Sequence, residues 1–239
     1  MAIRPVYVPQ EIGKRFVEIH NIEFQWFPGM SISQKQKSIE SLHKSFFEIT
    51  GKKCILEISS KSKNELGRLL SAFNLYMTTK KSKKEISVES AFQGSKVFEF
   101  GGPYEDLLYV ESIKAKKDER LKNSGRLVRF SFFGQEWPLE PKTLFYDWIY
   151  LNALHSSPKL SEKVLKYMAF TDIEFNPKKS INCQANSAAL YVSLHKRGLL
   201  KEALLSSLNY KKLFGVEKFK SINRASEQLS LSGFDVLFE

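Results

Sequence analysis

The residues best placed to do chemistry lie in the segment Ser87–Lys96, which reads SVESAFQGSK. On a helix, Glu89, Gln93 and Lys96 follow one another at i, i+4 and i+7, so a carboxylate, an amide and an amine share one face. A carboxylate and an amine within reach of one pocket can move protons or attack an electrophilic carbon. This segment is therefore the first candidate for a catalytic site.

The same spacing also fits a solvated helix face on which polar residues alternate with core residues. The small residues Ala91, Gly94 and Ser95 favour the catalytic interpretation, because they let a ligand or a neighbouring surface approach closely.

Two other polar segments offer ligand-binding groups. The pair Gly101-Gly102 lets backbone N–H groups approach a phosphate closely, although a glycine pair is also typical of a simple turn. Asn182 and Gln184 lie at the predicted start of a helix, where amides can bind an anion, read the edge of a base, or merely cap the helix.

Aromatic and metal-binding signals are weaker. Trp137, in the loop QEWPLEP, is the better candidate to stack on a base, whereas Trp148 is expected in the core. The sequence contains no phosphate-binding P-loop, dinucleotide-binding, zinc-protease or serine-hydrolase motif, and its four histidines have no ligand spacing. We therefore expect neither a metal nor a cofactor.

The chain is basic, with a formal net charge of +11, and residues 51–130 hold most of the excess. Lys80–Lys84 and Lys114–Lys122 lie in this block together with the candidate catalytic segment, which favours a phosphate-bearing ligand. No apolar run approaches the roughly 20 residues of a membrane-spanning helix, and residues 1–10 lack the apolar core of a signal peptide. Two cysteines, Cys54 and Cys183, are too few for a disulfide framework, so a cytoplasmic protein is expected.

Hydrophobic periodicity predicts strands and helices along the whole chain. The predicted strands are residues 15–27, broken near His20-Asn21, Cys54–Ile58 and Phe130–Phe133. The predicted helices run from an N-cap at Ser33 to Thr50, from Ser87 to before Gly101, over Lys142–His155, from Ser161 to Met168, and over Ala185–Arg197, Leu199–Leu208 and Glu217–Leu229. This pattern predicts one mainly α-helical domain over residues 1–239 with a small β element.

Several segments resemble the NADAR (YbiA-like) family over about residues 55–200. The family's LSNF-type segment is similar to LSAFN at Leu70–Asn74, and its Ser-Glu-His…Gln-x-x-Lys helix is similar to Ser87-Val88-Glu89 with Gln93 and Lys96. Its later LVE-x-x-P segment is similar to Asp172-Ile173-Glu174 through Pro177. Longer phrases, among them VFEFGGPYEDLL and FTDIEFNPKKSINCQA, resemble the NADAR antitoxins associated with DarT toxins over nearly the whole chain.

The resemblance implies an orthogonal helical bundle with residues 1–50 as a subfamily extension, residues 55–200 as the family core and residues 200–239 as C-terminal helices. It implies an ADP-ribosyl hydrolase that removes ADP-ribose from guanine bases of DNA and so reverses a DarT-type toxin, with ADP-ribose as product. The catalytic residues expected are Lys96, Glu89, Glu174 and Asp147. The expected substrate-binding residues are Ser60, Lys61, Ser71, Phe73, Asn74, Gln93, Gly101, Gly102, Trp137, Lys179, Asn182 and Gln184.

The chain also departs from the broad family. The usual histidine after the motif glutamate is Ser90, and an acid of the later segment is Lys179, without the Trp-Gly pair that follows in the family. These changes indicate a substrate other than the riboflavin intermediates of the broad family. Two alternatives stay open: cleavage of a free small molecule, such as a phosphorylated riboflavin precursor or an ADP-ribose derivative, and a non-catalytic antitoxin that binds its toxin.

Overall fold

The computed structural model describes residues 1–79 and 83–216. It contains two compact units. The first unit combines Met1–Ser71 with Ser157–Glu202, and the second combines Ala72–Ser156 with the chain from Ala203 onward. Part of the basic run Lys80–Lys84 and the predicted helix Glu217–Leu229 lie outside the described residues.

The first unit is built on a four-stranded sheet with the order β2-β1-β9-β3. Its strands are β1 (Ala2–Pro9), β2 (Val17–Phe24), β3 (Ile55–Glu57) and β9 (Ala169–Thr171). β1 and β2 form an antiparallel pair along their whole length, β9 runs antiparallel to β1, and β3 runs parallel to β9. The sheet thus joins the two ends of the first unit's sequence.

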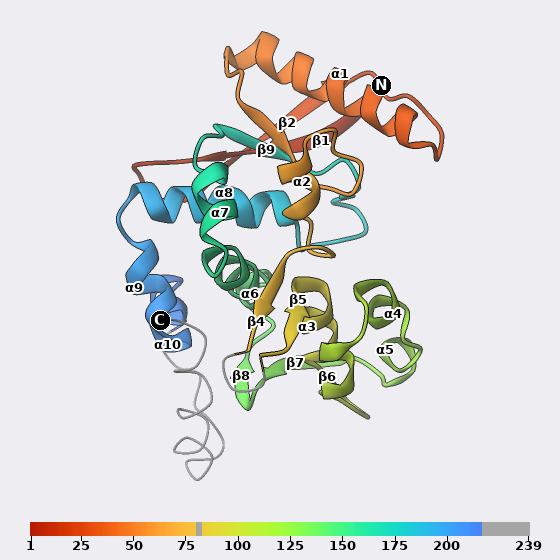
Figure 1. Cartoon of the computed structure of the whole chain (residues 1–239), viewed down its shortest axis with the longest axis vertical. Coiled ribbons are helices and arrows are strands. Elements are labelled where there is room, and N and C mark those ends of the chain that lie inside the picture. Colours follow the sequence, from red (N-terminus) through yellow and green to blue (C-terminus); the bar gives the residue numbers. More distant parts are fainter. Residues whose placement is uncertain (80–82, 217–239) are drawn as a thin grey trace. The chain divides into compact units, whose positions relative to one another are not determined.

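Helices cover both faces of this sheet, with α1 (Ile32–Thr50) on one side and α8 (Gln184–Lys196) on the other (Figure 1). α1 begins at Ser31, whose side chain accepts a hydrogen bond from the Gln34 N–H, and ends at Gly51 in the left-handed conformation that favours glycine. The short helices α2 (Glu65–Leu69) and α7 (Pro158–Val164) also belong to the unit, and α9 (Leu200–Leu205) spans its end.

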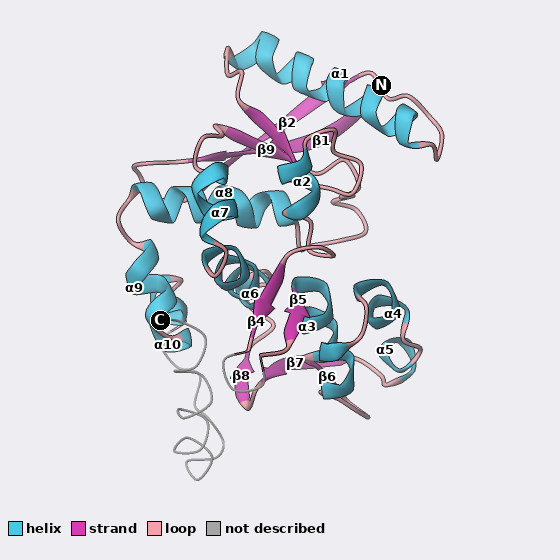
Figure 2. Ribbon diagram, viewed as in Figure 1, coloured by secondary structure: helices cyan, strands magenta, loops and turns pink. Residues whose placement is uncertain are grey.

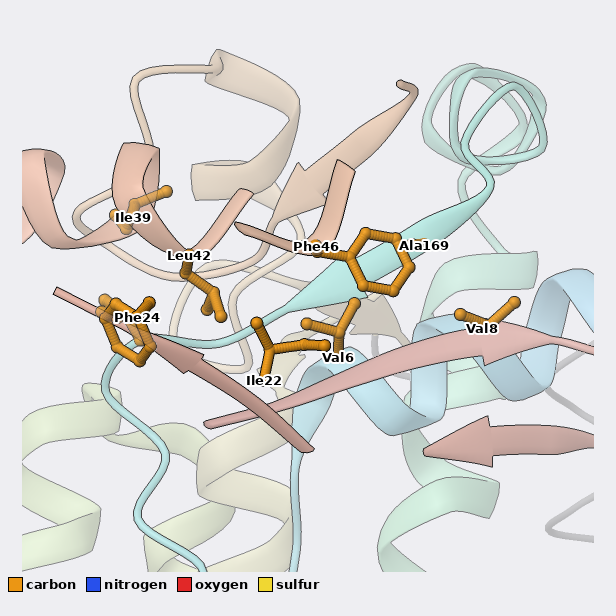
Figure 3. Packing of buried hydrophobic residues seen from close by; sticks show 9 residues of the cluster. Val6, Val8, Ile22, Phe24, Ile39, Leu42, Phe46 and Ala169 are labelled. Carbon is orange, nitrogen blue, oxygen red and sulfur yellow. The ribbon is translucent and has the colours of Figure 1, made fainter. Parts of the chain in front are cut away.

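The core of the first unit lies between α1 and the sheet. Figure 3 shows Ile39, Leu42 and Phe46 from the helix gathered over Val6 and neighbouring strand residues. Three of these positions, 39, 42 and 46, recur at helical spacing, which is why one stripe of α1 is buried while its other faces stay exposed.

The second unit contains two small sheets and a set of short helices (Figure 2). The sheets are the hairpin of β4 (Tyr76–Thr78) with β5 (Glu85–Ser87), and the antiparallel sheet of β6 (Lys96–Phe98), β7 (Leu127–Phe132) and β8 (Gln135–Trp137). The helices are α3 (Val88–Gly94), the 3-10 helix η1 (Glu105–Tyr109), α4 (Ser112–Lys117), α5 (Arg120–Asn123), α6 (Leu144–His155) and α10 (Ser207–Leu213).

The predicted fold class, a mainly helical orthogonal bundle, is wrong. The described residues form a mixed α and β structure with three sheets. Strand β1 escaped prediction because Val6, Tyr7 and Val8 are buried on both faces of the sheet, so the segment lacks the alternation of a half-buried strand. Pro5 and Pro9 weaken its strand signal further.

Several predicted boundaries also need correction. The N-cap of α1 is Ser31 rather than Ser33, and β2 is continuous through His20-Asn21. α7 begins at Pro158, upstream of the predicted cap Ser161. The predicted helix Leu199–Leu208 is divided between α9 and α10.

Leu42→Ala tests the core beneath α1. The Leu42 side chain is fully buried (0% exposed), so its truncation should lower the free energy of unfolding by about 2–5 kcal/mol. The control is Ile49→Ala on the same helix, where the side chain is 67% exposed and the change should stay within about 0.5 kcal/mol. Urea denaturation measures both, and equal losses would contradict the assigned core.

Candidate active site

The start of α3 is fixed by a dense set of hydrogen bonds. Ser87 is its N-cap, and its side chain accepts from the Ser90 N–H at 3.0 Å. The backbone N–H of Val88 donates to the Leu75 carbonyl and that of Glu89 donates to the Ala72 carbonyl, both at 2.9 Å. The two segments that carry the family resemblance are therefore in contact within the second unit.

Serine hydroxyls extend this network to α4. The Ser112 Oγ lies 2.9 Å from the Phe73 carbonyl oxygen and 2.7 Å from the Ser87 Oγ. Ser90, which replaces the family's usual histidine, is fully buried and donates to the Val110 carbonyl at 2.9 Å. At this position the chain uses a hydroxyl to hold the backbone beside the site.

Three predicted site residues form one hydrogen-bonded series. The Gln93 Nε2 donates to the Glu89 Oε1 at 2.9 Å, and the Lys96 Nζ donates to the Gln93 Oε1 at 2.6 Å. They do not share a helix, because α3 ends at Gly94 and Lys96 begins β6, where it pairs with Phe130. The predicted helix over the whole segment is wrong, but the turn through Ser95 still brings the lysine to the amide.

A second amine, which the sequence pattern did not single out, completes the group. The Lys116 Nζ on α4 lies 3.7 Å from the Glu89 Oε1 and 4.9 Å from the centre of the Phe73 ring. One buried carboxylate therefore serves two lysines, one directly and one through Gln93. Lys116 belongs to the basic run Lys114–Lys122, in which no spacing distinguishes it from its neighbours.

The protonation of Lys96 follows from this arrangement. Burial lowers the pKa of Lys96, the negative charge of Glu89 opposes the shift, and the positive charge of Lys116 adds to it. Burial is the largest of these causes. A lysine with a lowered pKa spends more time as a neutral amine, whose lone pair can attack an electrophilic carbon.

An aromatic cluster lies beside the Lys96 amine. The Lys96 Nζ lies 4.9 Å from the centre of the Phe92 ring, which packs on Phe130 and Tyr146 with ring centres 5.3 Å apart in both pairs. Phe145 stacks on Phe130 at 4.9 Å. These rings form part of the protein surface that partly buries the Lys96 side chain.

The glycine pair holds the backbone of Lys96. Gly102 has a φ of +83°, and a Cβ atom there would collide with the Lys96 carbonyl oxygen. A Cβ atom on Gly101 would collide with the Tyr104 hydroxyl. In the structure these glycines permit close protein packing, and their predicted contact with a phosphate stays a prediction.

The structure also places three other predicted residues of the second unit. Trp137 is fully buried and packs on Trp148 at 4.7 Å, so its ring is not accessible to a base, contrary to the prediction. Asp147 is buried on α6, where its charge adds to the effect of burial in raising the pKa of the Tyr210 phenol. Asn74 is exposed at the turn before β4.

The remaining predicted residues belong to the first unit. Glu174 is exposed and pairs with Lys35 at 3.2 Å, and Lys179 is exposed in a turn. The Gln184 Nε2 donates to the Ile58 carbonyl at 2.7 Å, while the buried Asn182 Oδ1 has no hydrogen-bond donor among the described residues. Ser60 is exposed, Lys61 is half-buried and Ser71 is buried.

The first unit also holds a pair of buried carboxyl groups that sequence reasoning missed. Glu57 accepts from the Thr171 hydroxyl at 2.6 Å and from the Ile173 N–H at 2.9 Å. Burial, followed by the charge of Glu57, raises the pKa of Asp172 well above its usual range. Two such acids side by side can retain a proton where an exposed acid would have lost it.

Changing Lys116 should move the pKa of Lys96 in a defined direction. Lys116→Gln removes a positive charge that disfavours protonation of Lys96, so the pKa of Lys96 should rise. Heteronuclear NMR of the lysine side chains measures the shift. Lys114→Gln is the matched control, since Lys114 lies on the same helix and pairs with Glu111 at 3.3 Å; a fall or no change in Lys116→Gln would contradict the proposed coupling.

Asp172→Asn should change how stability depends on pH. With a raised pKa in the folded chain, Asp172 favours folding at low pH, and this contribution is lost as pH rises through the raised pKa. Asparagine can still accept from the N–H groups of Glu174 and Phe175 but does not titrate. The unfolding free energy should therefore decline less steeply with rising pH, and an unchanged slope in urea titrations would contradict this.

Among the described residues, no helix is both long and apolar enough to cross a membrane, and no group of three or more His, Cys, Asp or Glu side chains is arranged to hold a metal ion.

Comparison with known proteins gives one clear relationship. No curated protein matches the chain. The family model for the DarT1-associated NADAR antitoxins matches residues 2–224. The chain therefore belongs to the family of DarT1-associated NADAR antitoxins.

Proposed function

We propose that this protein hydrolyses the bond between ADP-ribose and guanine bases of DNA and thereby reverses the modification made by a DarT-type toxin. One observation carries the proposal. The Lys96 amine is partly buried, has a lowered pKa and is held by Gln93 and Glu89. The family membership supports the antitoxin role, and the basic charge of the chain suits a polyanionic substrate.

In the proposed reaction the Lys96 lone pair attacks C1″ of the ribose attached to the base. The C1″–N bond breaks, and the guanine nitrogen receives one proton of the lysine amine. The C1″–O4″ bond then opens to a protonated imine on Nζ, while the ring oxygen takes a proton from water and leaves a hydroxide ion. The hydroxide ion adds to the imine carbon, its proton passes to Nζ as the C–Nζ bond breaks, and ADP-ribose leaves while the neutral amine is restored.

Gln93 and Glu89 have distinct parts in this reaction. Because Gln93 accepts one N–H of Lys96, it orients the amine. Glu89 contacts Gln93 and Lys116 rather than Lys96, so it acts as a positioning residue whose charge stabilises the cation that forms on Nζ. Asp147 and Glu174 stay candidates for a second acid, and a cytoplasmic site of action follows from DNA as substrate.

Incubation with an oligonucleotide that carries ADP-ribosylated guanine tests the activity. The unmodified strand and free ADP-ribose should appear, and Lys96→Ala should lower the rate by at least about 100-fold. Lys114→Ala is the control for a nearby surface lysine and should retain activity. Hydrolysis that survives in Lys96→Ala would remove Lys96 from the mechanism.

Borohydride separates a covalent role for Lys96 from an electrostatic one. Reduction during turnover should trap an adduct at Lys96, and active enzyme without an adduct would exclude the imine.

The rate of hydrolysis should rise with pH as Lys96 loses its proton. This rise should fall in a pH range below that in which an ordinary lysine loses its proton.

Two measurements distinguish the alternative functions. A protein that neutralises its toxin by binding would still rescue cells when Glu89→Ala and Lys96→Ala are present. An enzyme for free small molecules would cleave a phosphorylated riboflavin precursor or an ADP-ribose derivative but leave the modified oligonucleotide intact. Either result would overturn the proposed DNA-repair activity.

A further inference from the structure

The first unit contains a cavity of about 440 Å³ that none of the predicted site residues lines. It lies between the start of β3, the start of α2 and the end of α7. Three lysines from two of these regions, Lys53, Lys163 and Lys166, contribute to its wall.

The positive charge of this cavity is largely uncompensated. All three lysines are exposed, and none forms an ion pair with an acid in the part of the chain that the structure describes. Among the described residues, Glu65 is the only acid in the wall. Three lysines line one hollow, and the Nζ of one of them, Lys53, lies 5.5 Å from the centre of the Phe47 ring outside the wall. An anion bound in the hollow would be attracted by these positive charges.

Besides the lysines, the cavity wall contains a hydrogen-bond donor, the hydroxyl of Tyr167. The Asn64 side chain is anchored at the N-cap of α2, where its Oδ1 accepts from the Leu66 N–H at 2.9 Å, and its Nδ2 donates to the Tyr167 Oη at 2.8 Å. Since the Tyr167 oxygen accepts this bond, its own O–H proton points elsewhere. Asn64 and Tyr167 both line the cavity, so that proton is available to an acceptor bound there.

We propose that this cavity binds the phosphodiester backbone of DNA, at a site separate from the Lys96 group. The lysines would neutralise phosphates and Tyr167 would donate to a phosphate oxygen. An extended backbone suits the site better than an enclosed small anion, because the lysines come from different elements and most of the wall is exposed to solvent. The choice of DNA rests on the proposed function, whereas the presence of an anion site does not.

Cys54 provides a reporter of occupancy in the unaltered protein. Its thiol is exposed and lines the cavity, whereas Cys183 is buried. Iodoacetamide, a neutral reagent, should therefore label Cys54 selectively, and peptide mass spectrometry gives its rate. An unmodified oligonucleotide at low salt should slow this labelling by at least about fivefold, with protection lost as salt displaces the phosphates.

The charge variant Lys53→Gln/Lys163→Gln/Lys166→Gln should lose this protection. It should also reduce the slope of log affinity against log salt by about 2–3, since each phosphate contact contributes about 0.7–0.9. The matched control is Lys14→Gln/Lys37→Gln/Lys201→Gln, which removes the same charge from exposed lysines of the first unit outside the cavity. Tyr167→Phe should weaken protection without changing the net charge.

Three results would overturn the proposal. Protection that is absent at low salt would exclude DNA from the cavity, and equal loss in both triple variants would assign it to net charge alone. Equal protection by inorganic phosphate or ADP-ribose at matched phosphate concentration would make this a small-anion site. Because the DNA is unmodified and the readout is thiol labelling, these outcomes are independent of whether the protein hydrolyses ADP-ribosylated guanine.

Discussion

Partial burial of the Lys96 amine is the constraint on which the candidate site in the second unit depends. An ammonium group loses hydration when the protein covers it, so the burial of Lys96 favours the neutral amine. This burial requires the Lys96 side chain to be held in place. Pairing of β6 with β7 fixes its backbone, and Gly102 lets the neighbouring chain approach the Lys96 carbonyl.

Charge balance around Glu89 refines this environment. The carboxylate is buried at the N-terminal turn of α3, fixed through its backbone to the Ala72 carbonyl, and contacts Gln93 and Lys116. The negative charge of Glu89 limits the net positive charge of the group formed by Glu89, Lys96 and Lys116, which is partly buried. The replacement of the family's usual histidine by Ser90 is consistent with this design, since the serine serves the backbone and leaves the titrating groups to Glu89 and the lysines.

The first unit combines a mixed sheet with two buried acids. Its sheet joins strands from both ends of a discontinuous sequence, and α1 seals one face with a stripe of large aliphatic and aromatic residues. The unit also buries Glu57 on β3 and Asp172 directly after β9, and these acids accept hydrogen bonds from the Thr171 hydroxyl and from backbone N–H groups. Buried acids that accept hydrogen bonds are retained at the expense of their charge, so their protonation is linked to folding.

Elements whose signals are local can be predicted from the sequence alone. Gly51 and the spacing of Ile39, Leu42 and Phe46 predicted α1, and the apolar run after Pro141 predicted α6, because caps and periodicity act within a few residues. Residue types and spacing singled out Glu89, Gln93 and Lys96, and the family resemblance includes the same three residues. The folded chain was needed to show that Lys96 begins a strand, that Lys116 joins Glu89, and that Trp137 is buried. The mixed fold also depends on tertiary contacts, since the short strand β9 is recognisable only once β1 and β3, which are distant in sequence, pair with it and helices cover both faces of the sheet.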